Sequence, residues 1–346
     1  MAENSRTTTN RRKFLQLMAT LAVGGQAFIR SGSLKAAIEE ATASTDDWPK
    51  MTYRKLGRTG FNGSRLVFGC GAALSRGQAV NLLEPAFAAG VNVFDVGYRK
   101  YYGDAERNLA LFLKKRGDEV FVISKAPPGL DAEPHETVSV VQARAAAQSW
   151  LIQMDQSLSE LQVEHVDAYY LMATNNPSIV RSEEIHNAFQ QAKQAGKVSY
   201  LGISTHENAQ AVLEAAVETG WYDLMQIAIT PAGWYDWNNK SILQGTKDMA
   251  SLQPLLARAR EAGIGLIGMK AGRHLAGRGF LVSGEAKAYD KYYDEKFMAA
   301  QLNTFQRSYA YVLAHGLDAV NADMQSYQHL KENFVAAATS QDYFTA

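Results

Sequence analysis

The sequence predicts an α/β fold built as a closed barrel of eight parallel strands. Eight short apolar runs follow one another from residue 66 to residue 321, and most are separated by segments whose apolar residues recur at i, i+3 and i+4. Such alternation is typical of parallel strands joined by crossover helices. Without its first 43 residues the chain keeps about 300, the size of one such barrel with a few long loops. We therefore expect a (β/α)8 TIM barrel over residues 51–346.

The elements follow in a regular order. Thr59 and Gly60 are a turn signal between two short runs, residues 53–56 and 62–65, which predicts a β-hairpin that plugs the N-terminal end of the barrel. Strands are expected at residues 66–68, 91–94, 120–124, 166–171, 199–203, 224–227, 264–269 and 319–321. Helices are expected at residues 82–89, 105–114, 138–161, 183–195, 208–219 and 252–262. Four glycines stand where helices should end, as left-handed caps: Gly90, Gly196, Gly220 and Gly263.

Two of the loops that follow strands are long, and barrel enzymes carry their chemistry on such loops. The loop after the sixth strand spans residues 229–247 and contains Trp234, Tyr235 and Trp237. The loop after the seventh strand spans residues 271–296 and contains Arg273, His274, Arg278, Tyr289, Tyr292 and Tyr293. Clustered aromatic rings suit stacking on the apolar face of a sugar or another ring. The alternative is that these rings pack the loops onto the barrel.

Three ionisable residues fall at or just beyond the ends of the second and third apolar runs: Asp95, Tyr102 and Lys125. The carboxyl ends of barrel strands form one rim, so these side chains are expected to converge on one pocket. A lysine ammonium beside a tyrosine lowers the pKa of the phenol, and an aspartate keeps the lysine charged. Together the three residues predict a proton donor beside a bound carbonyl group.

Composition and charge exclude several classes of protein. Lysine plus arginine and aspartate plus glutamate both number 35; residues 1–43 hold six basic and three acidic side chains, so the remainder has a net charge of −3. No basic excess points to nucleic acid or to a membrane surface. The lone Cys70 excludes an intrachain disulfide and is expected to be a small buried residue rather than a nucleophile. The seven histidines show no paired ligand spacing, so no metal site is predicted; His206 and His274 are the two expected to reach the rim.

Several stretches, in order along the chain, resemble the aldo/keto reductases. They are residues 53–60, 94–95, 102–106, 122–125 and 196–204, and the likeness runs from about residue 53 to residue 338. Several motifs matched in order are a strong signal where one alone would be weak. The resemblance implies a (β/α)8 barrel and hydride transfer between a nicotinamide cofactor, NAD(P)(H), and a carbonyl or alcohol carbon. It also implies a catalytic tetrad, whose positions here are Asp95, Tyr102, Lys125 and Met172.

The chain departs from the family at the fourth tetrad position. Residues 167–172 resemble the strand that usually ends in a histidine, and here that position is Met172. A histidine N–H would hydrogen-bond and orient the substrate oxygen, whereas a thioether has no donor. Losing one such donor costs on the order of 100-fold in rate, so the usual carbonyl reduction is not assured by the tetrad alone.

The loop that leads to the tyrosine is a second departure, because it is longer than the loop of the family. Tyr98 and Tyr101 are therefore alternatives for the place of the proton donor. Tyr102 is preferred, since Gly103 and Glu106 follow it as they do in the family's pattern.

The resemblance implies an extended dinucleotide across the rim of the barrel. The positions that hold the nicotinamide amide match Ser204 and Gln226, and Thr205 stands where the family often has an asparagine. Lys270 supplies a positive charge for the diphosphate, and a glycine allows close approach of the backbone. The positions beside the diphosphate are Met269, Lys270 and Gly272.

Residues 327–333 resemble the family's final motif, which contacts the adenosine end of the cofactor. The contacts implied there are His329, Glu332 and Asn333. Asp323 stands where a glycine or a lysine is common, and its negative charge would repel a 2′-phosphate. We therefore predict NAD(H) over NADP(H).

The first 43 residues differ from the rest of the chain. Arg11 and Arg12, followed by residues 13–15 and a moderately apolar run to residue 29, resemble a twin-arginine signal peptide. The run is too short and too interrupted for a stable membrane span. Residues 41–43 are the preferred cleavage site and residues 25–27 the alternative; an uncleaved amphipathic anchor and a disordered basic tail are other interpretations. The signal predicts a periplasmic or other extracytoplasmic protein that the twin-arginine translocase exports folded.

These observations predict an exported oxidoreductase that acts on a small-molecule substrate. Because no soluble dinucleotide pool is expected outside the cytoplasm, we expect the cofactor to be retained tightly. A different class is a degenerate barrel that binds a sugar or another small ligand without turnover, and Met172 supports it. Asp95, Lys125, Gln226 and Lys270 favour the enzyme, because a binding protein has no evident need for them together.

Overall fold

The computed structural model describes residues 48–130, 132–276 and 284–344. The chain divides into two units, Met1–Ser44 and Thr45–Ala346, and the described residues all belong to the second. The predicted signal peptide over residues 1–43 and Arg278 of the second long loop lie outside the described residues. Within those three ranges, every helix falls short of the length and apolar character that a membrane crossing requires.

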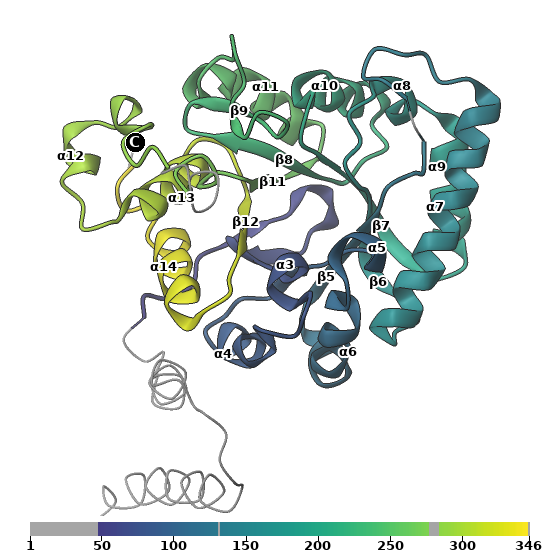
Figure 1. Cartoon of the computed structure of the whole chain (residues 1–346), viewed down its shortest axis with the longest axis horizontal. Helices are drawn as coiled ribbons and strands as arrows, with labels where there is room; N and C mark the ends of the chain where they lie inside the picture. Colours follow the sequence, from purple (N-terminus) through teal and green to yellow (C-terminus); the bar gives the residue numbers. More distant parts are fainter. Residues whose placement is uncertain (1–47, 131, 277–283, 345–346) are drawn as a thin grey trace, which may run out of the picture. The chain divides into compact units, whose positions relative to one another are not determined.

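The second unit is an eight-stranded parallel barrel, as the sequence predicts (Figure 1). Each strand pairs in parallel with its neighbours in the order β3-β4-β5-β6-β7-β8-β11-β12, and β12 pairs with β3 to close the ring. The barrel strands are β3 (Leu66–Gly69), β4 (Val93–Asp95), β5 (Phe121–Ala126), β6 (Val166–Leu171), β7 (Val198–Thr205), β8 (Leu224–Thr230), β11 (Gly265–Met269) and β12 (Ala319–Asp323). Closure leaves no unpaired edge, and all eight strand ends face one rim.

Helices surround the barrel on the outside (Figure 1). The six predicted helices are α4 (Leu83–Ala88), α6 (Ala105–Arg116), α7 (Val140–Leu161), α9 (Glu183–Gln194), α10 (Ala209–Thr219) and α11 (Met249–Glu261). Helices absent from the prediction are α3 (Cys70–Leu74), α5 (Arg99–Tyr102), α8 (Pro177–Val180), α12 (Glu295–Met298), α13 (Thr304–Ala314) and α14 (Tyr327–Ala338). Short 3₁₀ turns are η1 (Gly57–Thr59), η2 (Val80–Leu82), η3 (Gly117–Glu119) and η4 (Asp290–Tyr292).

Capping side chains fix where two of the predicted helices begin. Ser139 and Gln142 form a capping box, so α7 starts at Val140, two residues later than predicted. The Asp248 side chain accepts a hydrogen bond from the Ser251 N–H, so α11 starts three residues earlier than predicted.

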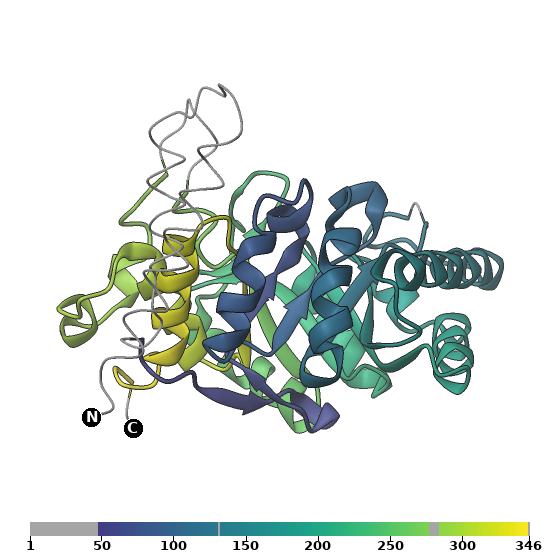
Figure 2. The same cartoon turned by 90° about the horizontal axis from the view of Figure 1, so that it is seen from below.

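The predicted hairpin is present as β1 (Tyr53–Lys55) and β2 (Asn62–Ser64), and it lies across one end of the barrel (purple in Figure 2). The Tyr200 hydroxyl donates to the Thr59 carbonyl at 3.0 Å, and the rings of Phe61 and Phe121 are 5.0 Å apart. Leu56 is fully buried among side chains inside the barrel. The hairpin therefore closes the end where the strands begin and leaves the opposite rim for the site.

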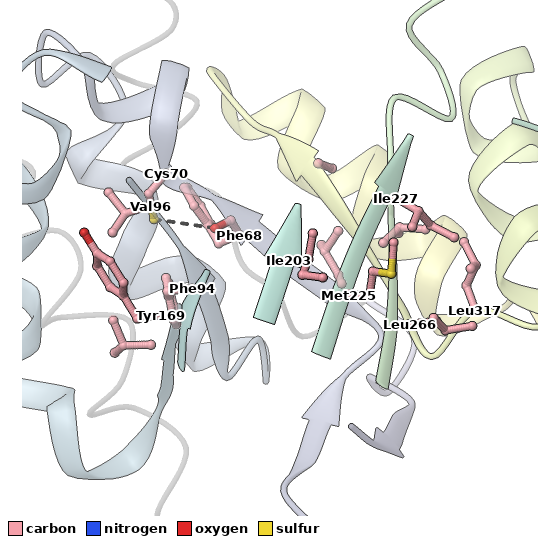
Figure 3. Close-up of a cluster of buried hydrophobic side chains, with 14 of the residues drawn as sticks. Phe68, Cys70, Phe94, Val96, Tyr169, Ile203, Met225, Ile227, Leu266 and Leu317 are labelled. Carbon is pink, nitrogen blue, oxygen red and sulfur yellow. Dashed lines mark hydrogen bonds between the residues drawn. The ribbon is translucent and has the colours of Figure 1, made fainter. Parts of the chain in front are cut away.

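The largest apolar core lies between the strands and the helices. Figure 3 shows part of it, with Phe68, Phe94 and Tyr169 around Cys70. The Cys70 side chain is fully buried, its Sγ lies 3.5 Å from the Phe68 carbonyl oxygen, and burial raises the pKa of its thiol. The prediction of a buried small residue at this position is confirmed, because a thiol with a raised pKa in the core is a poor nucleophile.

The two long loops are packed against the barrel. The first forms β9 (Gly233–Asp236) and β10 (Ser241–Ile242), an antiparallel extension of β8. Trp234, Tyr235 and Tyr289 are only 4%, 2% and 1% exposed, and Tyr292 and Tyr293 pack against buried clusters. For Trp234, Tyr235 and Tyr289 the packing alternative holds, because a buried ring has no face left for a sugar.

Candidate active site

A cavity of about 510 Å³ opens at the rim where the strands end. Every predicted site residue except Thr205 lines it: Asp95, Tyr102, Lys125, Met172, Ser204, Gln226, Met269, Lys270, Gly272, His329, Glu332 and Asn333. A larger cavity of about 700 Å³ lies along residues 134–143 and 176–184 and contains none of them. The rule that barrel chemistry gathers at strand ends therefore locates the site, and cavity size does not.

A buried ion pair lies at the base of the cavity. Lys125 Nζ is 2.5 Å from Asp95 Oδ2, and the two side chains are only 4% and 5% exposed. Asn321, at the end of β12, donates from Nδ2 to the same carboxylate at 2.5 Å. A buried carboxylate is tolerated here because a cation and an amide both satisfy it.

Tyr102 enters the cavity from α5 through a slot between two glycines. A Cβ on Gly71 would lie 2.4 Å from Tyr102 Cε1, and a Cβ on Gly97 would lie 2.8 Å from Tyr102 Cε2. Lys125 Nζ lies 5.7 Å from the centre of the Tyr102 ring. Tyr98 and Tyr101 do not line the cavity, and Tyr101 is 55% exposed. Among the three candidate tyrosines, Tyr102 is the one that faces the ion pair.

The electrostatic effect on Tyr102 is opposite to the one predicted from the sequence. Burial, and after it the negative charge of Asp95, raise the pKa of the phenol instead of lowering it. The reason is that Asp95 lies directly on the Lys125 ammonium and offsets its field at the ring. Tyr102 is consequently held protonated, which suits a donor of a proton.

Met172 closes one side of the cavity directly after β6. Its N–H donates to the Ala126 carbonyl at 2.9 Å, and its side chain is 4% exposed. The following residue, Ala173, has a φ of 51° and donates its N–H to Ser204 Oγ at 3.2 Å. The backbone is thus fixed, and the thioether presents an apolar surface with no hydrogen-bond donor.

Gln226 and Ser204 offer polar groups beside the ion pair. The Gln226 side chain is 1% exposed, and its Nε2 has no hydrogen-bond partner within the described part of the chain. A buried amide donor without a partner costs free energy, so a ligand acceptor fits at this position. Thr205, in contrast, turns away from the cavity: its hydroxyl donates to Asn175 Oδ1 at 2.9 Å and to the Glu207 carbonyl at 2.7 Å.

Positive charge gathers on one wall of the cavity. Lys270 has a left-handed backbone with a φ of 67°, and burial followed by repulsion from Arg273 lowers the pKa of its ammonium to about 8. Its Nζ lies 4.5 Å above the ring of Trp237. A Cβ on Gly272 would lie 2.9 Å from Phe305, so this wall has little room for a larger residue. Partly desolvated cations and close backbone suit a phosphate group.

The far end of the cavity is formed by β12 and α14. His329, Glu332 and Asn333 line it from α14, and Asp323 lines it from the last residue of β12. Asp323 accepts a hydrogen bond from Gln325 Nε2 at 2.8 Å.

Asn321 and His206 are among the lining residues that were not assigned a site role from the sequence. Asn321 ends the eighth predicted strand, so the strand-end rule that found Asp95 applies to it as well. His206 also lines the cavity, as expected for the rim, whereas His274 does not and instead lies 3.5 Å from Glu285. Burial and the neighbouring lysines lower the pKa of His206 to about 3, so its imidazole is neutral. In the described ranges no group of three His, Cys, Asp or Glu residues is arranged to hold a metal ion.

The family model of the aldo/keto reductases matches residues 61–342. The chain belongs to this family. Among curated proteins, L-glyceraldehyde 3-phosphate reductase of Escherichia coli is 28% identical over 184 residues, which cover 50% of this chain and 51% of that protein. Versiconal hemiacetal acetate reductase of Aspergillus parasiticus is 23% identical over 200 residues, which cover 51% of this chain and 58% of that protein. The chain thus spans about half the length of the curated relatives that it matches.

Solved structures of aldo/keto reductases share the fold. The holo form of the aldo-keto reductase AKR11C1 from Bacillus halodurans has a TM-score of 0.58 at 21% identity, covering 83% of this chain and 90% of that one. The thermostable aldo-keto reductase Tm1743, solved in complex with the inhibitor epalrestat, has a TM-score of 0.59 at 19% identity, covering 86% of this chain and 96% of that one.

Proposed function

We propose that this aldo/keto reductase family member is an oxidoreductase that transfers a hydride between a nicotinamide dinucleotide and a carbonyl or alcohol carbon. The observation that carries the proposal is one cavity that holds the Asp95–Lys125 pair, Tyr102 and the unpartnered amide of Gln226. A ligand-binding barrel has no evident need for a desolvated ion pair beside a protonated phenol. In carbonyl reduction Tyr102 donates its proton to the oxygen as the carbon is reduced.

The cavity residues fit a dinucleotide. Gln226 Nε2 is available to the oxygen of a carboxamide, and Lys270 to a diphosphate. When bound, the nicotinamide supplies or accepts the hydride. We propose NAD(H) over NADP(H), because Asp323 places a carboxylate at the adenosine end, where it would repel a 2′-phosphate.

Titration of the gel-filtered protein with NADH and with NADPH tests the proposal first. Fluorescence should report binding of both, tighter for NADH, and mass spectrometry of the protein as purified should detect retained nucleotide. Because two relatives are named as reductases of an aldehyde and of a hemiacetal acetate, glyceraldehyde and 4-nitrobenzaldehyde are suitable substrate probes. Tyr102→Phe should abolish oxidation of NADH by these probes and leave binding intact. Absence of dinucleotide binding at millimolar concentration contradicts the proposal.

A second candidate function is ligand binding without turnover, and the observation that favours it is Met172 in place of an orienting histidine. Met172→His distinguishes the two functions. An enzyme that lacks a donor at this position should gain carbonyl reductase activity from the imidazole, whereas a binding protein should stay inert.

We also propose that residues 1–43 are a twin-arginine signal and that the folded domain functions outside the cytoplasm. The support is the Arg11-Arg12 pair followed by residues 13–15 and the apolar run. Fractionation of cells that express the full chain should find it in the periplasm. The double substitution Arg11→Lys and Arg12→Lys should retain it in the cytoplasm; unchanged export of that variant contradicts the proposal.

A further inference from the structure

The carbonyl-reduction chemistry proposed above leaves a hydrogen bond unassigned. A substrate oxygen beside Tyr102 needs a second donor to fix its direction, and Met172 cannot supply one. Two side chains near the base of the cavity, Lys125 and Asn321, donate hydrogen bonds to the Asp95 carboxylate. Gln226 Nε2 is assigned above to the carboxamide of the cofactor, so a further lining residue with an N–H would supply the missing donor.

His206 is placed to fill that gap. Strand β7 lies directly beside β6, with Leu171 opposite Ile203, so the next pair along the two strands is Met172 and Ser204. His206 lies two residues beyond Ser204 and lines the same cavity as Met172. Because His206 directly follows the last residue of β7 and lines the cavity, its imidazole lies at the same rim as Met172.

The imidazole of His206 is held in place by contact with an aromatic ring. Its ring lies 5.1 Å from the ring of Trp237 at an interplanar angle of 35°. Lys240 and Lys270 lie over the same indole, at 2.9 Å and 4.5 Å from its centre. No hydrogen bond joins a ring nitrogen of His206 to another residue in the described part of the chain. The ring is oriented by its tilted contact with Trp237, and its polar atoms remain for a ligand in the cavity that it lines.

We propose that His206, directly after the strand next to the one that usually carries the family's histidine, donates the hydrogen bond that orients the substrate carbonyl oxygen. Burial, and after it repulsion from Lys270 and Lys125, lowers the pKa of His206 to about 3, so the imidazole is neutral beside these two cations. A neutral imidazole carries one N–H and no net charge, so it hydrogen-bonds a carbonyl oxygen without adding to the repulsion. The inference rests on the proposed function of the same site.

Two substitutions separate hydrogen bonding from packing. His206→Phe keeps a ring against Trp237 but has no donor, whereas His206→Asn keeps a donor on a shorter side chain. His274→Ala is the matched control, because His274 lies on the other long loop and does not line the cavity. The rescue variant combines His206→Phe with Met172→His, which restores an imidazole at the neighbouring strand end.

Each variant is measured in two assays. The first is turnover of 4-nitrobenzaldehyde with NADH, in which loss of one such donor should lower kcat about 100-fold in His206→Phe. Partial recovery is expected in His206→Asn and in the rescue variant, and no change in His274→Ala. The second is binding of isobutyramide, an unreactive carbonyl compound, to the protein with and without NADH, followed by fluorescence.

The second assay keeps the inference testable if the proposed function fails. In it His206→Phe should weaken amide binding about tenfold and leave NADH binding unchanged, and the rescue variant should restore amide binding. If the wild type binds NADH but reduces no aldehyde, the proposed function fails while the amide titration still reports whether His206 contacts a carbonyl oxygen. Equal kcat or equal amide binding in His206→Phe and wild type overturns the inference, as does a wild type that binds no amide.

Discussion

Tyr102 is positioned by steric fit at the level of single atoms, because the glycines on either side of its ring leave room for nothing larger than hydrogen. Gly71→Ala would put a Cβ 2.4 Å from Tyr102 Cε1. Because Gly71 lies inside α3, the alanine favours the helix, so a loss of activity cannot come from helix propensity. We expect kcat to fall about 100-fold, as for other misplaced catalytic groups, with little change in dinucleotide binding.

Gly117→Ala is the control for that substitution. Gly117 has a helical backbone, and a Cβ there would meet no atom within 4 Å. This variant should keep full activity and gain a few tenths of a kcal/mol to about 1 kcal/mol in stability. Steady-state kinetics and thermal unfolding of both variants test the argument, and an active Gly71→Ala enzyme would show that the ring does not need the slot.

Asp95 and Lys125 form the second residue-scale feature, since each is buried and depends on the other. Lys125→Met leaves the Asp95 carboxylate at the base of the cavity with only Asn321 to satisfy it. We expect this single change to cost about 3–5 kcal/mol, the usual penalty for a buried charge that loses its partner. Combining it with Asp95→Asn should recover much of the loss, because the charge is removed as well. Urea unfolding of the wild type, the two single variants and the double variant measures their free energies of unfolding as a double-mutant cycle. Additive effects of the two substitutions would contradict a coupled pair.

Sequence patterns predict side chains at strand ends well and the contacts among them poorly. Asp95 and Lys125 were assigned from the ends of apolar runs, and Ser204 and Gln226 from the family resemblance; the closed ring brings all four to one cavity. The orientation of Thr205 depends on Asn175, which follows a different strand, so no local pattern contains it. The direction of the Tyr102 pKa shift depends likewise on burial and on how closely Asp95 offsets Lys125, which only the folded geometry fixes.

At the scale of elements, the N-terminal hairpin acts as a plug because its turn fits against the start of β11. Gly57 has a φ of 52°, and a Cβ there would lie 2.2 Å from the Gly265 nitrogen and 2.4 Å from the Gly263 oxygen. These are backbone atoms that cannot rotate away. Gly57→Ala should therefore destabilise the protein by about 3 kcal/mol, combining overpacking with left-handed strain.

Gly60→Ala isolates the strain from the crowding in that hairpin. Gly60 is also left-handed, with a φ of 71°, but a Cβ there would have no neighbour within 4 Å. Only the backbone penalty of about 1–2 kcal/mol should appear. Thermal unfolding compares the two variants, and equal losses would mean that the plug does not press on β11.

Helix α13, which packs on more than one side, was absent from the sequence prediction. Ser308 and the consecutive residues Ala310, Tyr311, Val312 and Leu313 of α13 are all buried, so no single apolar stripe recurs every three to four residues. Helices α7 and α9 keep a solvent face and were therefore predicted; α9 begins at the expected residue, and α7 begins two residues later, at its capping box. The packing of α13 is a property of the closed barrel and its loops, not of its own sequence.

At the scale of the whole molecule, the barrel gathers cations from separate strands and loops around one rim. Lys125 lies in β5, Lys240 in the loop after β9, and Lys270 directly after β11. Among the charged groups that shift the pKa of Lys270, Asp323 is the acidic one. Their mutual repulsion adds to burial in lowering the pKa of Lys270 to about 8. An anion at the rim relieves this repulsion, so ligand charge and protonation of Lys270 are linked.

The sign of the pH dependence follows from that linkage. Lys270 is charged below its pKa of about 8 and loses its proton as the pH rises through that value, so the charge that attracts a diphosphate disappears on the alkaline side. The dissociation constant for NADH should rise about tenfold between pH 7 and about pH 9, because the protonated fraction falls by that factor. In the free protein the lowered pKa has the opposite effect on folding: between about pH 8 and pH 10.5 the unfolded chain binds more protons, so stability from this group rises with pH.

Lys270→Gln tests the effect of pH on NADH binding and its effect on folding stability in one variant. The variant should bind NADH weakly at pH 7 and lose most of the pH dependence above it, while its thermal stability at pH 7 should equal or exceed that of the wild type because a repelled cation is gone. Fluorescence titration and thermal unfolding across this pH range provide the measurements. If the variant keeps the wild-type pH profile, then Lys270 does not face the diphosphate, and the cations of the rim act on some other charged ligand.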